Sequence, residues 1–286
     1  MDPLEKSPVI VIGMHRSGTS LVSRVLSDLG VFMGWRQDRN AEARAFIALN
    51  KWLLVQAGAA WDQPEPLDLF LADRPSRTIA ADFCRDALAG RAGLSFLGPR
   101  GWLRTRSLDA YRGQWGWKDP RNTLTLPLWR DLWPNARVVH VLRNGLDVAA
   151  SLKHRHEQRI DHARKHLASR RWHWRASKRS LDAARFASMD GGMSLWQHYV
   201  GQARAALVTA GHKGIELRYE DLLRQPDVEL ARLGRWLGLP DPAPGLESLT
   251  VTVDSGRAEA WRQDKEICDE APRFAGLLAD FGYRIN

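Results

Sequence analysis

The chain has 286 residues, of which 44% are hydrophobic and 26% charged, a composition typical of a globular protein with a sizeable core. No apolar run approaches the roughly 20 residues that span a bilayer. The opening MDPLEKSPVIVIG carries acids in its charged part and only a five-residue apolar run, which suits a buried strand better than a signal peptide, so a cytoplasmic location is expected. Its two cysteines lie outside any CxxC pattern and indicate neither a disulfide framework nor a zinc site. The net charge of +9 predicts attraction to anions without identifying them.

Strands and helices are predicted to alternate along the chain. The apolar run at 9–12 is typical of a buried strand, and the helical spacing after it stops at Gly30. The proline-containing stretch 61–75 is predicted to be a loop. Further strands are expected within 113–120, 137–143 and 214–219, and further helices at 41–54, 77–90, 122–133, from 144, 194–211 and 227–240.

This alternation favours an α/β fold in three layers, a parallel sheet flanked by helices, with ligands at the carboxyl ends of the strands. Because no repeat or low-complexity segment interrupts the chain, residues 1–286 are predicted to form a single domain. Within it, a basic helical insert is expected at about 153–180, with ten Lys or Arg against two acids. A solvated helical face is its simplest explanation, and a lid over an acceptor, carrying Trp172 and Trp174, is the functional alternative.

The stretch VIVIGMHRSGTSLV has the spacing of a phosphate-binding loop between a strand and a helix. Gly13 and Gly18 match the pattern GxxxxGK[ST], but Thr19 stands where the lysine belongs. Backbone N–H groups at a helix amino end still cradle a phosphate oxyanion, whereas the cation that bridges the β and γ phosphates is missing. The loop therefore suits a 5′-phosphate without a polyphosphate chain, with Arg16 and Ser17 partly replacing the lost cation.

Four blocks, in the correct order over residues 9–240, resemble the sulfotransferases that use 3′-phosphoadenosine 5′-phosphosulfate (PAPS). The segment GMHRSGTSLV resembles their 5′-phosphosulfate loop, and VVHVLRNGLDVAASL places Arg143 and Ser151 eight residues apart, as in their 3′-phosphate site. The segments WGWKDPRNTLTLP and ELRYEDLLRQPDVELARLGRWLGLP resemble two further blocks of the family.

The resemblance implies the P-loop-like sulfotransferase fold, PAPS as co-substrate, and no metal. It implies that Tyr219 contacts the adenine, while SGRAEAWR loosely resembles the loop that closes over the 3′-phosphate, with Arg257 or Arg262 serving there. A tyrosine packed at a strand end and a plain surface loop remain the alternatives. The implied donor-binding residues are Arg16, Ser17, Gly18, Thr19, Ser20, Arg143, Ser151, Tyr219 and Arg257.

The same resemblance suggests a catalytic set. Arg16 is expected to hold the sulfuryl oxygens, and Lys118 resembles the lysine that stabilises the group in transit in tyrosylprotein sulfotransferases. Pro120 stands where the cytosolic branch has its histidine base, so the chain resembles the tyrosylprotein type, in which a glutamate after the first helix, here Glu42, is the base. Alternatively, Asn40 caps the helix at 41–54 and Glu42 only favours its dipole; Asp119 is the reserve base.

The function expected is transfer of the sulfuryl group of PAPS to an acceptor hydroxyl or amine by in-line displacement, releasing 3′,5′-bisphosphoadenosine. A P-loop kinase with an atypical loop and Asp221 as magnesium ligand is one alternative, and a nucleic-acid binder built on the basic insert is another. A carbohydrate or other small acceptor is expected, a peptide or lipid remains open, and no nucleic-acid partner is expected. The bias towards arginine, alanine and tryptophan is typical of a GC-rich bacterial genome.

Overall fold

The computed structural model describes residues 7–165, 183–239 and 257–285. The chain divides into two compact units, one of Met1–Leu142 with Tyr199–Ala258 and the other of Arg143–His198 with Glu259–Asn286. Within the described ranges, no helix is long and apolar enough to cross a membrane. The prediction of a single domain over 1–286 stays a prediction.

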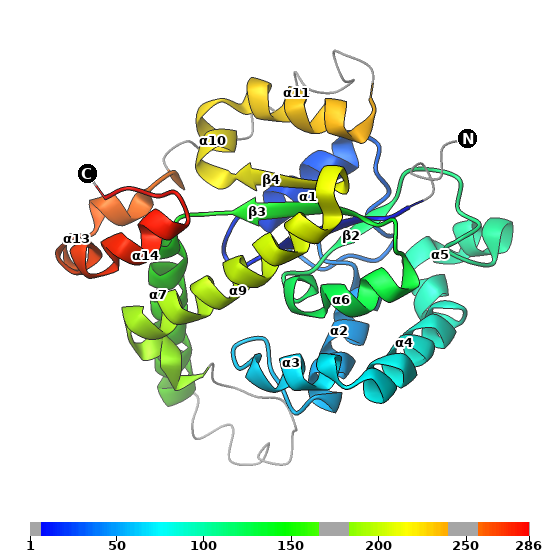
Figure 1. The fold of residues 1–286 in the computed structure, drawn as a ribbon, viewed down its shortest axis with the longest axis horizontal. Coiled ribbons are helices and arrows are strands. Elements are labelled where there is room, and N and C mark those ends of the chain that lie inside the picture. Colours follow the sequence, from blue (N-terminus) through cyan, green and yellow to red (C-terminus); the bar gives the residue numbers. More distant parts are fainter. Residues whose placement is uncertain (1–6, 166–182, 240–256, 286) are drawn as a thin grey trace. The chain divides into compact units, whose positions relative to one another are not determined.

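The first unit contains a four-stranded parallel sheet in the order β2-β1-β3-β4 (Figure 1). Its strands are β1 (Val9–Gly13), β2 (Gly116–Lys118), β3 (Arg137–Leu142) and β4 (Gly214–Arg218). All residues of β1, β2 and β3 are buried. For β1 and β3 this confirms the prediction of buried strands from apolar runs, and β2 confirms the short strand expected within 113–120. The central strands β1 and β3 therefore lie where both faces of the sheet are covered.

Helices cover both faces of this sheet (Figure 1). On one face, Val9 and Val11 belong to a core cluster with α1 and α11, which contribute Val22 and Leu233 among others. On the other face, α6 packs against β1, and Trp117 of β2 stacks on Phe46 of α2 at 3.9 Å between ring centroids. The fold is therefore the three-layer α/β fold that the sequence predicts.

The helices of the first unit follow the prediction in most places. They are α1 (Thr19–Asp28), α2 (Arg44–Gln56), α3 (Glu65–Ala72), α4 (Arg74–Leu88), α5 (Arg91–Thr105), α6 (Asn122–Leu132), α10 (Tyr219–Arg224) and α11 (Pro226–Leu237), with the short η4 (Gly211–Lys213). The loop prediction for 61–75 is wrong, because Pro64 and Pro66 fall at the N-cap and first turn of α3, where proline starts a helix instead of breaking one. Helix α5 was not predicted from the sequence.

The second unit is helical. It contains α7 (Gly145–Lys165), η3 (Ala184–Ala187), η7 (Ala260–Gln263), α13 (Lys265–Glu270), η8 (Ala271–Phe274) and α14 (Ala275–Asp280), and the boundary between the units falls within α9 (Met189–Ala210). Lys153 of α7 pairs with Glu266 of α13 at 2.6 Å, and Trp196 packs edge-on against Phe281. These contacts join the C-terminal segment to α7 and to the first half of α9.

The predicted basic insert begins as the continuation of α7. Residues 153–165 form the last part of this helix. The rest of the insert, with Trp172 and Trp174, lies outside the described residues. Its predicted role stays a prediction.

Glu216 provides a test of the sheet register. His140 and Glu216 are partners across β3 and β4, with Nδ1 of His140 2.9 Å from Oε2 of Glu216, and Arg204 also contacts this carboxylate. Burial raises the pKa of Glu216, but the His140 and Arg204 contacts outweigh it and lower the pKa from 4.5 to about 2. Ionised Glu216 therefore stabilises the fold above pH 4.5, and this contribution is lost as the pH falls towards 2.

We expect Glu216→Gln to flatten the loss of unfolding free energy between pH 4.5 and 2, measured by denaturant titration at each pH. Glu229→Gln is the control, because it removes a carboxylate whose ion pair is with Arg232, one turn further along the same helix. If the free energy of unfolding of Glu216→Gln fell with pH as steeply as that of the wild type, the loss of stability could not be assigned to protonation of Glu216.

Candidate active site

Residues 14–18 form the predicted phosphate-binding loop between β1 and α1. Arg16 and Gly18 have left-handed backbone angles, with φ of 73° and 91°, and such residues turn successive N–H groups towards one concave side that suits an anion. The Ser17 hydroxyl donates to the carbonyl of Met14 at 2.6 Å, so it braces the loop from within. The Arg16 side chain is exposed. The loop thus offers backbone donors and one cation at the amino end of α1.

The Tyr219 ring packs directly on this loop. A Cβ atom at Gly18 would lie 2.2 Å from Cδ2 of Tyr219, so only glycine fits beneath the ring. Tyr219 is the first residue of α10, directly after β4, and it is buried. The structure therefore brings Tyr219 to the loop that is predicted to hold the donor.

Lys118, at the carboxyl end of β2, supplies a cation beside the start of α1. Its Nζ donates to Glu42 Oε1 at 3.1 Å, to the Asn40 carbonyl at 2.6 Å and to Ser20 Oγ at 3.3 Å. The side chain is 1% exposed, and a buried ammonium group requires such oxygen partners. Ser20 directly follows Thr19, the residue in the place of the missing loop lysine, so Lys118 brings an ammonium group to this end of α1 from another strand.

Glu42 precedes α2 and does not belong to its first turn. The Asp38 carboxylate accepts from the backbone N–H groups of Asn40 and Glu42 at 2.8 and 3.0 Å, and this turn, with Ala41 at a φ of 57°, delays the helix until Arg44. The alternative in which Asn40 caps a helix at 41–54 is therefore wrong, because Ala43 is the N-cap residue and makes no side-chain bond.

Burial shifts the pKa values of both Glu42 and Lys118. Burial, aided by Asp119, raises the pKa of Glu42 above 4.5 against the opposing effect of Lys118. Burial also lowers the pKa of Lys118 below 10.5, although the Glu42 carboxylate opposes this shift. The two groups form a buried acid–base pair whose pKa values are displaced towards each other.

A polar network behind this pair was missed by the sequence analysis. Asp119 is fully buried and accepts from Arg121 at 2.8 Å and from Asn50 Nδ2 at 2.9 Å, which favours a structural role for this reserve base. The Arg121 guanidinium lies 3.8 Å from Glu42 Oε2. Arg121 could have been singled out from the sequence, because the segment KDPR places it three residues after Lys118. Asn50 lies within a helix, and nothing in the sequence marks it.

Aromatic side chains contact His15 of the loop. His15 is 4.3 Å from Trp61 between ring centroids, and the buried Tyr199 donates its hydroxyl to the Trp61 carbonyl at 2.8 Å. Mutual backbone bonds between Ala60 and Gln63 close a tight turn with Trp61 at its tip. A half-buried indole is therefore held next to the residue that precedes Arg16.

The second unit contains Arg143, Ser151 and Arg262 of the residues predicted for the 3′-phosphate, whereas Arg257 falls in the first unit. Arg143, the residue after β3, lies 3.4 Å from Asp147, and Asp147 also accepts from the backbone N–H of Trp261 at 2.8 Å. Asp147 thus links Arg143 to the segment that includes Arg262, whose guanidinium stacks on Trp261. Ser151 lies half-buried two turns into α7.

The predicted residues thus fall into separate groups. The first unit brings Ser20, Glu42 and Lys118 together, and it brings Gly18 against Tyr219. Thr19 is buried in the first turn of α1. Arg257, exposed, begins the last described range. Among the described residues, no cluster of His, Cys, Asp and Glu has the makings of a metal site.

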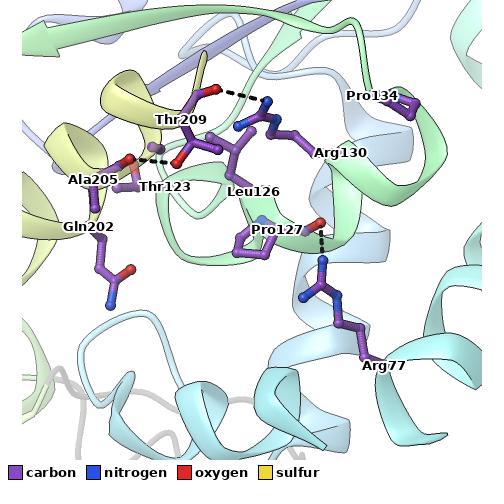
Figure 2. Close-up of a pocket in the computed structure, with 10 residues that line it drawn as sticks. Arg77, Thr123, Leu126, Pro127, Arg130, Pro134, Gln202, Ala205 and Thr209 are labelled. Carbon is purple, nitrogen blue, oxygen red and sulfur yellow. Dashed lines mark hydrogen bonds between the residues drawn. The ribbon is translucent and has the colours of Figure 1, made fainter. Parts of the chain in front are cut away.

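A cavity of about 430 Å³ lies between α4, α6 and α9 in the first unit (Figure 2). Arg77 donates to the Pro127 carbonyl across it at 2.9 Å, and Arg130 approaches the Thr209 carbonyl. None of the predicted site residues lines it. Thr123, however, lines it and also bonds to Gly13 of the loop.

A parallel sheet covered by helices, with a glycine-containing loop between β1 and α1, defines an α/β protein with ligand-binding potential at the carboxyl ends of its strands. The model of the sulfotransferase family matches residues 8–243, so the chain belongs to this family. No curated protein sequence matches the chain.

Solved structures agree on the fold. The sulfotransferase domain from the Synechococcus PCC 7002 olefin synthase aligns with a TM-score of 0.53 at 15% identity, over 100% of this chain and 99% of that one. The sulfotransferase domain from the curacin biosynthetic pathway aligns with a TM-score of 0.52 at 14% identity, over 96% and 97%. At these identities the likeness shows the fold alone.

Replacing Gly18 tests the packing of Tyr219 on the loop. We expect Gly18→Ala to lower the free energy of unfolding by more than the roughly 1–2 kcal/mol of left-handed strain, because the Tyr219 ring must also move. Gly30→Ala is the matched control, since Gly30 has a φ of 89° with nothing within 4 Å of the added Cβ. Denaturant unfolding measures both, and equal losses would contradict the packing.

Proposed function

We propose that the protein transfers the sulfuryl group of PAPS to an acceptor hydroxyl or amine and releases 3′,5′-bisphosphoadenosine. The observation that carries the proposal is the position of Lys118, bonded to Ser20 beside the loop and to Glu42. The loop itself keeps the anion-binding backbone without the lysine that serves a nucleoside triphosphate. Membership of the sulfotransferase family supports the same reaction.

The donor site is built from the loop outward. The N–H groups of residues 16–20, at the amino end of α1, are suited to the 5′-phosphate, and Arg16 is suited to the sulfuryl oxygens. Tyr219, packed on Gly18, is the proposed adenine contact. In the second unit, Arg143 and Ser151 are the proposed 3′-phosphate ligands, with Asp147 orienting the guanidinium. Arg257, at the end of the first unit, is a further candidate.

The transfer step needs a base, a stabilised leaving group and alignment. Glu42 accepts the proton of the acceptor as the new S–O bond forms, and its raised pKa gives it more basicity than an exposed glutamate. Lys118 stabilises the negative charge that appears on the phosphate oxygen as the old S–O bond breaks, with PAPS supplying the activated sulfuryl group. This division of roles is that of the tyrosylprotein type.

The acceptor side is proposed from Trp61. Its half-buried indole lies beside the loop, and a flat aromatic face packs well on the C–H face of a sugar or another ring. A carbohydrate or a small polar metabolite is therefore the acceptor class that we propose. A peptide or a lipid would be the alternative result of an acceptor screen.

Calorimetric titration tests the donor. We expect the purified chain to bind 3′,5′-bisphosphoadenosine and not ATP with magnesium, and we expect Arg143→Ala to weaken the binding at least about tenfold through loss of a charge-assisted contact. Arg130→Ala, which removes one cation at the separate cavity, is the control and keeps the affinity.

Binding of ATP with magnesium instead would favour the kinase, and binding of neither nucleotide would reject the proposed donor. Undiminished affinity in Arg143→Ala would remove this residue from the site. Arg143→Ala leaves buried Asp147 without this ion pair, which can destabilise the fold. A thermal unfolding scan of the variant therefore checks that it is folded before its affinity is interpreted.

A further inference from the structure

We propose that Thr123 is a positioning residue for the donor loop, an inference that rests on the proposed function. Thr123 lies in the first turn of α6 and is 2% exposed. The Gly13 N–H donates to its Oγ1 at 2.8 Å, and its hydroxyl donates back to the Gly13 carbonyl at 3.2 Å. One side chain thus satisfies both polar backbone groups of the residue from which the loop starts.

The short length of β2 explains why a side chain is needed there. β2 pairs only with Val9–Val11, whereas β3 pairs with β1 as far as Gly13. In the part of the chain that the structure describes, no strand pairs with β1 on the β2 side beyond Lys118. Asn122 donates to the Val11 carbonyl at 3.2 Å and Thr123 bonds to Gly13, so α6 continues the hydrogen bonding that β2 leaves off.

Gly13 has little room to move once it is held. Its φ is 142°, and a Cβ there would lie 2.6 Å from the Val141 carbonyl and 3.1 Å from Ser17 Oγ. Gly13 is paired with β3 on one side and bonded to Thr123 on the other, so its backbone, and with it the path of the chain into the loop, is fixed. The orientation of the N–H groups in the loop that follows is set from this point.

The same turn relates the loop to the catalytic pair. Asn122, next to Thr123, accepts from Asn50 at 2.8 Å and from Trp117 at 3.0 Å. Asn50 in turn donates to Asp119, the residue after Lys118. The hydroxyl of Thr123 therefore holds the donor loop to the element that carries Lys118, which sets where the 5′-phosphate lies relative to the ammonium group.

The test compares hydroxyl loss with hydroxyl retention. Thr123→Val keeps the shape and removes the hydroxyl, and Thr123→Ser keeps the hydroxyl. Thr105→Val is the control, because the half-buried Thr105 hydroxyl also donates to a backbone carbonyl, that of Gly101 at 3.0 Å, but within α5 and away from the loop and the Asn50 network. The measurements are the Kd for 3′,5′-bisphosphoadenosine by calorimetry on the full chain and the Tm.

We expect Thr123→Val to bind the bisphosphate at least about tenfold more weakly, and Thr123→Ser to stay within about threefold of the wild type. Thr105→Val keeps the affinity. If Thr123→Val does not fold, Thr123→Ala, which avoids placing a methyl group against the Gly13 peptide, replaces it in the same comparison.

Wild-type affinity in Thr123→Val would overturn the inference while leaving the proposed function intact. An equal loss in Thr105→Val would overturn it as well, since general loosening would then explain the result. A wild-type chain that does not bind the bisphosphate would reject the proposed function and the inference together.

Discussion

The buried ammonium group of Lys118 is the interaction on which the rest of the candidate site depends. A charge that is 1% exposed is tolerated only with partners, and three oxygens meet it, from Ser20, Asn40 and Glu42. These partners come from α1 and from the turn before α2, so the requirements of one cation bring together segments distant in the sequence. The proposed catalytic pair and the end of the proposed donor loop are thereby placed side by side.

The polar network behind Lys118 extends this constraint into the core. Asn50 has each of its two amide atoms bonded within the buried layer, to Asp119 and Asn122 on one side and to Thr125 and Trp129 on the other. A buried network with its groups satisfied is rigid, because every displacement leaves a donor or acceptor without a partner. Such a support suits a site whose catalysis depends on positioning.

The parts of the fold that follow from local pattern could be predicted, and the parts that follow from side-chain geometry could not. Continuous apolar residues predict β1 and β3, and the glycine spacing predicts the loop. The late start of α2 could not be foreseen, since it depends on the Asp38 carboxylate turning the backbone, and α3 was missed because its prolines fall at a helix start. Neither Asn50 nor Thr123 belongs to a recognisable sequence motif. The contact of Thr123 with Gly13 is seen only in the structure, where β2 is too short to pair with Gly13.

The most direct test of the account is the pH dependence of kcat for PAPS-dependent transfer to the first acceptor that a screen identifies, in the wild type and in Glu42→Gln. Burial raises the pKa of Glu42 above 4.5 and lowers the pKa of Lys118 below 10.5. As the pH increases, kcat therefore rises where Glu42 loses its proton and falls where Lys118 loses its proton. The account predicts that Glu42→Gln loses activity at least about a hundredfold and with it the acidic limb. A Glu42→Gln variant that transfers at the wild-type rate with the same acidic limb would contradict it.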